Sequence, residues 1–407
     1  MSAQRSIAQL KLLLLLPSLH GGGAERVALN LLKGIDPNLA EVRIGLLKEG
    51  GHYFNDLDYA ALVRSSVGQG LFDFDGPNSL AYHPLKALQA AVMAPRRIRS
   101  LIRSYEPDII ISFLKGMNLL TWRALNGMQE RRPFWIAREG NNALRVIEEE
   151  APNTIVKTIV KHLTAKVYRA ADITLGISKR QAQDLCSQFN LDPSRVRFIH
   201  NGIDVDLIRS CMSETPNGLP TKPFIVTAGR LEPQKGHDLL LEAYAKSVAH
   251  AAMDLVLLGT GSQLDLLKSK AANLGISERV HFPGFQNNPW SWFARSEFFV
   301  FPSKWEGFGN VVAEALACGV PVLSTDCDYG PGEIVEHGVN GLLVKVGDNT
   351  ALAQGLDTMA TNKDWRRQLA ARSVARARKF NVRNMCYQYE RLLNETTSDK
   401  VAPRNDP

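Results

Sequence analysis

The chain has 407 residues, 45% of them hydrophobic, so it is long enough for two α/β domains with separate cores. Its five cysteines are odd in number and scattered, which argues against a disulfide framework or a zinc site and favours a reducing cytosol. The net charge of +7 belongs to one half: residues 1–205 contain 26 Lys and Arg against 19 Asp and Glu, whereas residues 206–407 contain 22 of each.

The first half alternates short apolar runs with helical patterns, which indicates a parallel sheet. The first run, residues 12–16, could belong to a signal peptide. It is short, ends at Pro17 and precedes a glycine run, so it predicts a buried first strand instead. No run approaches the roughly 20 apolar residues that span a bilayer. Further strands are predicted at residues 42–47, 109–113, 134–137, 173–177 and 196–199.

Two segments of this half have the pattern of basic amphipathic helices. Their basic residues are Arg96, Arg97, Arg99 and Arg103 in the first, and Lys157, Lys161, Lys166 and Arg169 in the second. We expect these surfaces to contact an anionic membrane leaflet, which attracts each nearby basic residue by about 1 kcal/mol. A solvated helix face is the alternative. No nucleic-acid partner is expected, since no nucleic-acid-binding motif accompanies the charge.

The second half repeats the alternation of strands and helices after a polar, breaker-rich segment, residues 211–223, which predicts an interdomain linker. Domains are accordingly predicted at residues 1–205 and 206–381. The polar tail, residues 395–407, is expected to fray. Strands of the second half are predicted at residues 224–228, 255–258, 280–282, 298–301, 320–324 and 341–344.

The most informative stretch runs from Ser303 to Leu323. Glu306 lies in a glycine-rich loop, and Glu314 lies inside the helix for which Asn310 is the predicted N-cap. A helix N-terminus suits phosphate, but two carboxylates would repel one. They suit the neutral hydroxyls of a sugar and a ribose on either side of a diphosphate. The alternative is a solvated helix start with two ordinary acids.

This E-x7-E pair resembles the motif of the retaining glycosyltransferases of family 4, and shorter matches follow the family's order across residues 12–350. These matches are Gly21 to Glu25, His200 to Asp204, Gly229 to Leu231, Lys235 with Gly236, Leu258 to Gly261, Phe282 to Gly284, and His337 to Val344. The resemblance implies an α/β GT-B fold, in which two Rossmann-like domains turn their parallel sheets toward a central cleft. It further implies an acceptor-binding first domain, a nucleotide-sugar-binding second domain, and a final helix, residues 382–394, that returns to the first.

By the same resemblance, Arg230 and Lys235 bind the donor diphosphate and form the catalytic set together with Glu306. The alternative for Arg230 is a surface ion pair with Glu232. Glu314 is expected to hold the ribose and Glu306 the donor sugar. The other expected donor contacts are Gly22 and Gly23 after the first strand, Gly259 and Gly261 in a turn, Phe285 near the base, and the backbone of Phe308, Gly309 and Asn310.

On the acceptor side, many family members carry a His after the strand that corresponds to residues 109–113, and this chain has none. Lys115 is the expected replacement, with an ordinary surface lysine as the alternative. Arg138, Glu139 and Asn141 are predicted to contact acceptor hydroxyls, unless they form a satisfied loop. We expect no metal cofactor. The D-x-D triplets are attributed to chance, and Arg230 with Lys235 supplies the positive charge that a metal would bring.

The sequence therefore predicts a peripheral retaining glycosyltransferase on the cytoplasmic face of the plasma membrane. Its donor is expected to be a nucleotide diphosphate sugar, with UDP the commoner base in the family and GDP still open. Its expected acceptor is a lipid-linked oligosaccharide or a lipopolysaccharide core. The alternatives are a nucleotide-sugar epimerase or phosphorylase on the same fold, and a non-catalytic sugar- or lipid-binding module.

Overall fold

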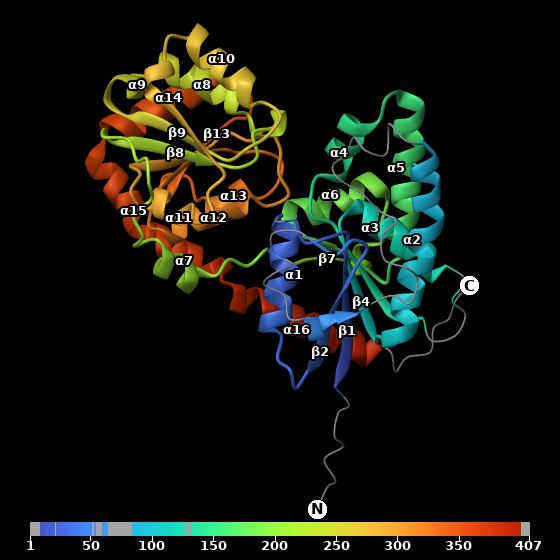
Figure 1. The fold of residues 1–407 in the computed structure, drawn as a ribbon. Coiled ribbons are helices and arrows are strands. Elements are labelled where there is room, and N and C mark those ends of the chain that lie inside the picture. The colour runs from blue at the N-terminus through green and yellow to red at the C-terminus, as the bar shows by residue number, and fades with distance from the viewer. Residues whose placement is uncertain are drawn as a thin grey trace, which may run out of the picture. The chain divides into compact units, whose positions relative to one another are not determined.

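The computed structural model describes residues 9–20, 22–50, 53, 59–63, 84–126, 128 and 132–399. The chain divides into two compact units, each with its own parallel sheet (Figure 1). Unit 1 comprises Met1–Ile177, Gln181–Ile199 and Met385–Pro407, and unit 2 comprises Ser178–Arg180 and His200–Asn384. Among the described residues, no helix is both long enough and apolar enough to span a membrane.

Unit 1 contains, in its described part, a seven-stranded parallel sheet of order β3-β2-β1-β4-β5-β6-β7. The strands are β1 (Leu10–Leu16), β2 (Ala40–Leu46), β3 (Leu62–Val63), β4 (Ile109–Phe113), β5 (Phe134–Arg138), β6 (Ile173–Gly176) and β7 (Val196–Phe198). The helices are α1 (Gly23–Gly34), α2 (Pro84–Tyr105), α3 (Lys115–Leu125), α4 (Ala143–Glu150), α5 (Thr154–Ala170) and α6 (Lys179–Phe189), with 3-10 turns at Tyr59–Ala61 and Pro193–Arg195.

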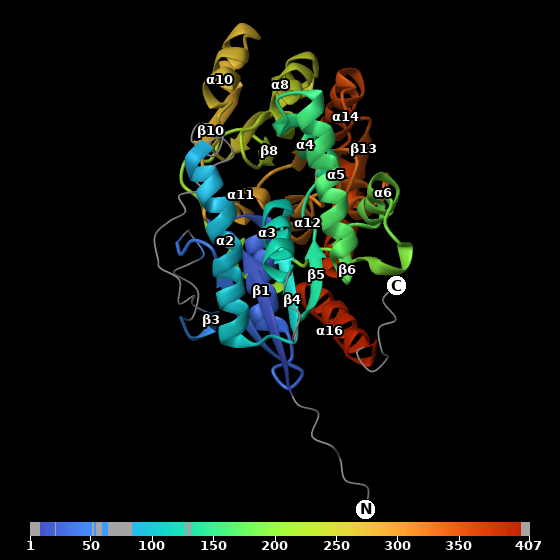
Figure 2. The same ribbon diagram turned by 90° about the vertical axis from the view of Figure 1, so that its right-hand side faces the viewer.

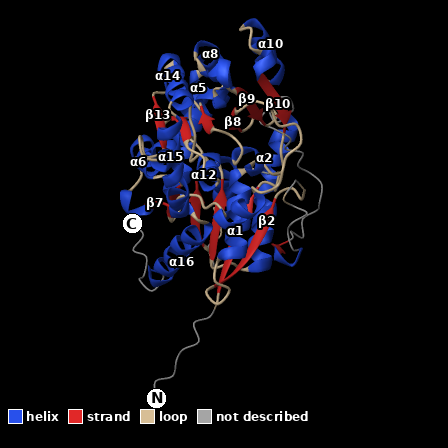
Figure 3. Ribbon diagram, turned by 90° about the vertical axis from the view of Figure 1, so that its left-hand side faces the viewer, coloured by secondary structure: helices blue, strands red, loops and turns tan. Residues whose placement is uncertain are grey.

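The leucine run of β1 lies between two layers of helices. Leu13 and Leu15 share a core with residues of α2, α3 and α5, which lie in front of the sheet in Figure 2. The opposite face is covered by α1 and by α16 (Val382–Asp399), as Figure 3 shows. Both faces of β1 are thus buried, which explains why this strand has a continuous apolar pattern rather than an alternating one.

Unit 2 contains, within the described residues, a six-stranded parallel sheet of order β10-β9-β8-β11-β12-β13. The strands are β8 (Phe224–Ala228), β9 (Asp254–Leu258), β10 (Val280–Gly284), β11 (Phe298–Phe301), β12 (Val322–Thr325) and β13 (Gly341–Val344). The helices are α7 (Val205–Cys211), α8 (His237–Lys246), α9 (Ala249–Ala252), α10 (Leu264–Asn273), α11 (Trp290–Phe293), α12 (Asn310–Ala317), α13 (Pro331–Ile334), α14 (Asn349–Thr361) and α15 (Lys363–Ala377), with 3-10 turns at Pro233–Lys235, Ser277–Arg279 and Arg378–Phe380.

The core of unit 2 is likewise split by its sheet. Phe298 and Val300 of β11 join a cluster with buried residues of α8, α10 and α14. Phe299, which points to the other face, packs against Phe293 of α11 with ring centroids 5.0 Å apart. Alternate residues of this strand therefore pack against helices on opposite faces of the sheet, because successive side chains of a strand point to opposite faces.

The prediction that residues 211–223 form an interdomain linker is wrong, because these residues lie inside unit 2. Asn288 donates to the carbonyl of Cys211 at 2.8 Å, and Arg295 donates to the carbonyls of Met212 and Ser213, each at 3.1 Å. These bonds hold a polar, breaker-rich segment against the unit. The first unit ends after Ile199 rather than after residue 205.

The last helix, α16, belongs to both units. From Met385 onward its residues group with unit 1, where the Tyr389 hydroxyl accepts from Nε of Arg138 at 3.0 Å. The backbone N–H of Asp36 donates to the Glu390 carboxylate at 2.9 Å. The helix thus returns to the first unit, as the family resemblance implied. It extends to Asp399, past the start of the predicted frayed tail.

Candidate functional site

The predicted catalytic residues meet where the sheet of unit 2 reverses its strand order. β8 has β9 on one side and β11 on the other, so the chain leaves β8 and β11 at neighbouring carboxyl ends. Ligands of open α/β sheets bind at such switch points. Arg230 and Lys235 follow β8, and Glu306 follows β11.

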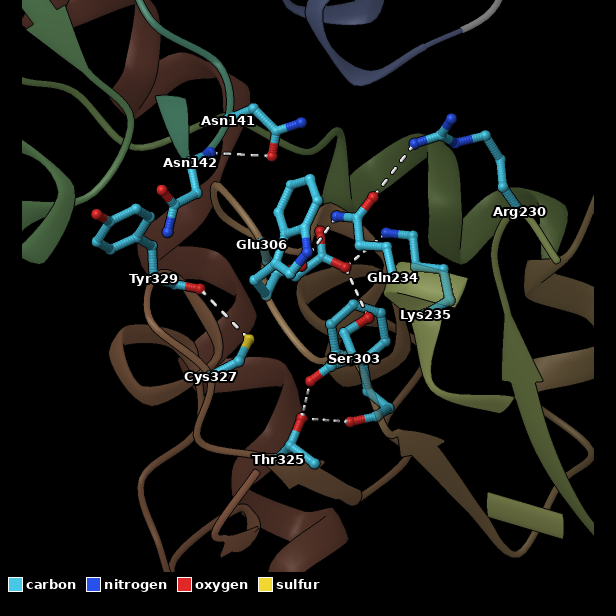
Figure 4. Close-up of polar contacts among 12 residues, drawn as sticks. Asn141, Asn142, Arg230, Gln234, Lys235, Ser303, Glu306, Thr325, Cys327 and Tyr329 are labelled. Atoms are coloured by element: carbon cyan, nitrogen blue, oxygen red, sulfur yellow. Dashed lines mark hydrogen bonds and ion pairs between the residues drawn. The ribbon is translucent and has the colours of Figure 1, made fainter. Parts of the chain in front are cut away.

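Direct hydrogen bonds join the loops that follow β8 and β11 (Figure 4). Gln234 donates from Nε2 to the carbonyl of Trp305, and the N–H of Lys304 donates to the carbonyl of Gln234, both at 2.8 Å. Gly236 has φ 65°, and a Cβ there would lie 2.2 Å from the carbonyl oxygen of Pro302. A glycine is therefore required for the approach that places Lys235 beside the second loop.

Lys235 and Glu306 form the central ion pair of the site. Nζ of Lys235 lies 2.5 Å from Oε1 of Glu306, and the two side chains are 15% and 9% exposed. Ser303 donates to the same oxygen at 2.7 Å. Because little water reaches the pair, its charges act on a bound ligand more strongly than surface charges would.

Arg230 offers the second positive charge of the site. Its guanidinium donates to Oε1 of Gln234 at 3.4 Å, and it forms no ion pair with any residue in the described part of the chain. Glu232, the alternative partner, instead accepts from the N–H and hydroxyl of Ser262 at 2.9 and 2.6 Å. Burial opposes the ionisation of Glu232, but these bonds prevail and lower its pKa. Arg230 therefore keeps its charge available for a ligand.

Helix α12 begins one residue earlier than predicted, because Gly309, with φ 87°, is its N-cap, and Asn310, the predicted N-cap, is its first residue. The Asn310 side chain accepts instead from Nδ2 of Asn201 at 2.8 Å. The capping residue thus has no side chain with which to bond the first N–H groups of the helix. A helix end of this kind suits an anion.

Phe308, the residue before this cap, is buried, with its ring 5.4 Å from that of His200 and 5.5 Å from that of Phe380. A Cβ on Gly330 would lie 1.8 Å from the Phe308 carbonyl oxygen, so Gly330 covers that oxygen. The backbone N–H groups are what this segment can offer a ligand, and their contact with the donor stays a prediction.

Glu314 lies on α12 and is buried, with 6% of its surface exposed. Its Oε2 accepts from the indole N–H of Trp290, on α11, at 3.0 Å. Sequence analysis did not predict a role for Trp290, because no local pattern connects it with a glutamate 24 residues further along the chain.

In the predicted turn from Gly259 to Gly261, both glycines are required because there is no room for a side chain. A Cβ on Gly259 would lie 1.9 Å from the Gly229 carbonyl oxygen, and one on Gly261 would lie 2.5 Å from that of Leu231. The two glycines let this turn approach the strand end that carries Arg230. Phe285 lies beyond β10, and 60% of its surface is exposed. Donor contacts by these residues stay predictions.

In unit 1, α1 begins at Gly23 with Gly22 as its N-cap, while Gly21 lies outside the described residues. A Cβ on Gly22 would lie 2.5 Å from Oε2 of Glu25, so the Glu25 carboxyl lies against Gly22. Burial raises the pKa of Glu25, an effect that nearby backbone N–H groups and His20 partly offset. Donor contacts by Gly22 and Gly23 stay predictions.

Two of the predicted acceptor ligands are buried and serve the fold of unit 1. Arg138, 1% exposed, bonds Tyr389 of α16 and lies over the Phe113 ring. Glu139, 2% exposed, accepts from the Tyr168 hydroxyl and from the N–H of Asn141. Burial raises the pKa of Glu139, against the opposing effect of those bonds. Little of either side chain is open to a ligand, and an acceptor contact by Arg138 or Glu139 stays a prediction.

The other two acceptor candidates are partly exposed. Lys115 begins α3 and forms an ion pair with Glu150 at 2.8 Å. Asn141 accepts from the N–H of Asn142 at 3.1 Å (Figure 4). Both follow the carboxyl ends of neighbouring strands, β4 and β5. An acceptor contact by either residue stays a prediction.

The predicted basic face of α2 is only partly correct. Arg97 is 7% exposed, and burial lowers its pKa, an effect that Glu49 partly offsets. Arg99 donates to the carbonyls of Ala124 and Asn126 at 3.0 and 3.1 Å and so closes the end of α3. Arg99 therefore stabilises unit 1 and Arg97 is buried in it, whereas Arg96 and Arg103 are exposed.

The D-x-D triplets were attributed to chance, and two can be placed. Asp204 caps α7 by accepting from the N–H of Leu207, and Asp326 pairs with Arg180 at 3.0 Å. The described residues contain no group of three His, Cys, Asp or Glu side chains that could hold a metal. The triplets at Asp56 and Asp73 lie outside the described part.

Two α/β units, each built on a parallel sheet, are the architecture of the GT-B fold. The fold is similar to that of HepE from Anabaena, solved with UDP-glucose, at a TM-score of 0.73 and 23% identity over 96% of this chain and all of that one. It is also similar to the sucrose-phosphate synthase of Thermosynechococcus elongatus, with TM-score 0.73, 17% identity and the same coverage.

The family follows from sequence comparison. Residues 21–207 match the model of Glycosyltransferase Family 4, and residues 214–379 match that of Glycosyl transferases group 1. A Campylobacter jejuni N-acetylgalactosaminyltransferase, named for its diphospho-undecaprenol-linked substrate, is 31% identical over 91% of this chain and 96% of its own length. LpsE of Rhizobium meliloti, a lipopolysaccharide core glycosyltransferase, is 26% identical over 86% and 89%. The chain belongs to the family 4 glycosyltransferases.

Proposed function

We propose that this enzyme transfers a sugar from a UDP-sugar to a lipid-linked oligosaccharide or a lipopolysaccharide core, with retention of configuration. The observation that carries the donor half of the proposal is the Lys235–Glu306 pair beside Arg230 at the switch point of unit 2. The acceptor class and the UDP donor are supported by the substrates named for the Campylobacter and Rhizobium relatives and by the UDP-glucose in the HepE structure.

In the proposed reaction, Arg230 and Lys235 bind the diphosphate and stabilise the negative charge that develops as it leaves the anomeric carbon. Glu306 holds a hydroxyl of the donor sugar, and Glu314 holds the ribose. The acceptor hydroxyl attacks from the face that the phosphate leaves, and the departing phosphate oxygen takes its proton. The protein's contribution is positioning and charge stabilisation. Because the two cations serve the diphosphate, we propose that no metal is required.

The first test measures the melting temperature of the full chain with UDP, GDP, ADP and a panel of UDP-sugars, each with and without EDTA. Ligands that bind the folded state raise this temperature. We expect UDP and one or more UDP-sugars to raise it equally in both conditions. A rise with GDP alone would replace UDP in the proposal. A rise that EDTA abolishes would contradict metal independence.

Two further assays separate the alternatives. Incubation with the donor alone would yield an epimeric UDP-sugar if the enzyme were an epimerase. With an acceptor present, NMR of the new glycosidic bond reads whether the configuration is retained. No melting shift with any nucleotide, with or without membrane vesicles, would contradict a nucleotide-sugar transferase.

A membrane-bound acceptor also requires the enzyme to reach a membrane surface, and we propose that α5 makes this contact. Ile155 and Ile159 are 73% and 60% exposed. They lie four residues apart and therefore share one helix face. Lys161, two residues after Ile159 on the same helix, is exposed as well. Exposed aliphatic groups beside basic ones are typical of helices that lie in a membrane interface. The five free cysteines agree with a cytoplasmic location, where thiols stay reduced.

The double variant Ile155→Ser, Ile159→Ser is expected to weaken binding to vesicles of phosphatidylglycerol and phosphatidylcholine at least about tenfold. Each isoleucine contributes roughly 1.5–3 kcal/mol when it is buried in an apolar phase. Flotation of the protein with vesicles measures the effect. The matched control is Val248→Ser, Leu266→Ser, which removes aliphatic groups that are 55% and 62% exposed on unit 2. Equal vesicle binding by both double variants would contradict a contact through α5.

A further inference from the structure

Glu306 is held by a residue that the sequence motif does not assign, Ser303. The Ser303 side chain is fully buried, two residues beyond β11, and its hydroxyl donates to Oε1 of Glu306 at 2.7 Å (Figure 4). The same Oε1 accepts from Nζ of Lys235 at 2.5 Å. Within the described residues, nothing bonds Oε2 of Glu306. One oxygen of the carboxylate is thus fixed by two donors, and the other is left for a ligand.

Ser303 is itself held in place by the neighbouring strand. Thr325, the last residue of β12, is 3% exposed, and its hydroxyl lies 2.5 Å from the carbonyl oxygen of Ser303 and 3.3 Å from that of Phe301. Water does not compete for these buried groups, and a lost bond would leave a buried polar atom unsatisfied. The orientation of Glu306 is therefore set through Ser303 by the end of β12.

The two donors on Oε1 differ in how firmly they can hold it. Lys235 has a long, flexible side chain, and in the proposed reaction its ammonium group also serves the diphosphate. Ser303 has a single side-chain torsion and a buried hydroxyl, so it keeps its position while Lys235 moves between carboxylate and phosphate. A donor of this kind is needed if Glu306 is to stay aligned with the sugar once the diphosphate is bound.

We propose that Ser303 is a positioning residue that orients Glu306 toward the donor sugar, with Thr325 as its support. The inference rests on the proposed function, because it takes the ligand of Oε2 to be the sugar of a UDP-sugar. It follows that Ser303 affects binding of the sugar portion of the donor and leaves binding of the nucleotide portion unchanged. A residue with a general structural role would affect both.

Calorimetry with Ser303→Ala tests this separation, using UDP alone and the UDP-sugar that raises the wild-type melting temperature most. We expect the affinity for UDP to stay within about twofold, and the affinity for the UDP-sugar and kcat/KM to fall about tenfold. The matched control is Ser324→Ala on β12. It removes a fully buried hydroxyl that bonds the Thr325 carbonyl at 2.9 Å and is not bonded to Glu306. The control is expected to bind both ligands as the wild type does.

A double-mutant cycle shows whether Ser303 acts through Glu306. In a Glu306→Ala background, which removes the group that accepts from Ser303, Ser303→Ala is expected to cause less than a twofold further loss of UDP-sugar affinity. Thr325→Val keeps the shape of the side chain but removes the hydroxyl. It is expected to lower UDP-sugar affinity selectively as well, but by a smaller factor than Ser303→Ala. This variant keeps the inference testable if Ser303→Ala does not fold.

Three outcomes would overturn the inference: equal losses of UDP and UDP-sugar affinity, unchanged UDP-sugar affinity in Ser303→Ala, or a full tenfold effect that persists in Glu306→Ala. Failure of the proposed function looks different, because the wild-type enzyme would then bind neither UDP nor any UDP-sugar.

Discussion

Replacing Glu306 by Gln is expected to lower kcat about 10²- to 10³-fold, the range found when a preorganised polar contact to a reacting group is removed. The amide keeps the size of the side chain and can still accept from Lys235 and Ser303, so the fold should be preserved. The substitution removes the negative charge of Glu306. This charge acts strongly on a ligand because the Glu306 side chain is only 9% exposed. Initial rates of UDP release in the presence of acceptor measure the effect.

The control for this variant is Glu242→Gln. Glu242 also pairs with a lysine, Lys270, and accepts from Asn349 at 2.6 Å, so the same charge is lost from a comparable ion pair on α8. Its turnover is expected to equal that of the wild type. Wild-type turnover by Glu306→Gln would show that the sugar is held elsewhere, and the assignment of Glu306 would be wrong.

Replacing Arg230 by Ala is expected to lower kcat by a similar factor, about 10²- to 10³-fold, and to weaken UDP binding about tenfold. Among the residues that the structure describes, its guanidinium has one weak hydrogen-bond partner, Gln234 at 3.4 Å, so removing it leaves no buried group unsatisfied there and should not disturb the fold. A charge that acts on the departing diphosphate gains strength in the transition state, so kcat should fall more than UDP affinity. Steady-state kinetics and calorimetry with UDP separate the two effects.

Two further variants define the role of Arg230. Arg230→Lys keeps the positive charge but not the planar guanidinium, which can donate two parallel hydrogen bonds to a phosphate. Its kcat is expected to lie between that of Arg230→Ala and that of the wild type. Arg367→Ala removes a guanidinium that is 69% exposed on α15 and should change neither quantity. If Arg230→Ala lost UDP affinity while kcat stayed at the wild-type value, Arg230 would be a ground-state ligand and not a catalytic group.

Local patterns were sufficient to predict most of the architecture. Strands β4, β8, β11 and β13 were predicted with the boundaries that the structure has, since each is a short apolar run between polar or breaker residues. The order of the matches to the family's motifs, in turn, pointed to the residues that meet at one switch point, including Arg230, Lys235 and Glu306. This succeeded because the carboxyl ends of adjacent parallel strands meet at one sheet edge, whichever residues separate them in the chain.

Burial and pairing of polar side chains, in contrast, were decided by the tertiary structure. Arg138 was predicted to contact an acceptor, but its partner Tyr389 is 251 residues further along the chain, on a helix that returns to unit 1. Ser303 was unremarked beside Glu306 until the turn after β11 brought its hydroxyl onto the carboxylate. A polar residue has the same local pattern whether it faces solvent, a ligand or a buried partner. Which of these it meets depends on distant segments that supply the partner and exclude the water.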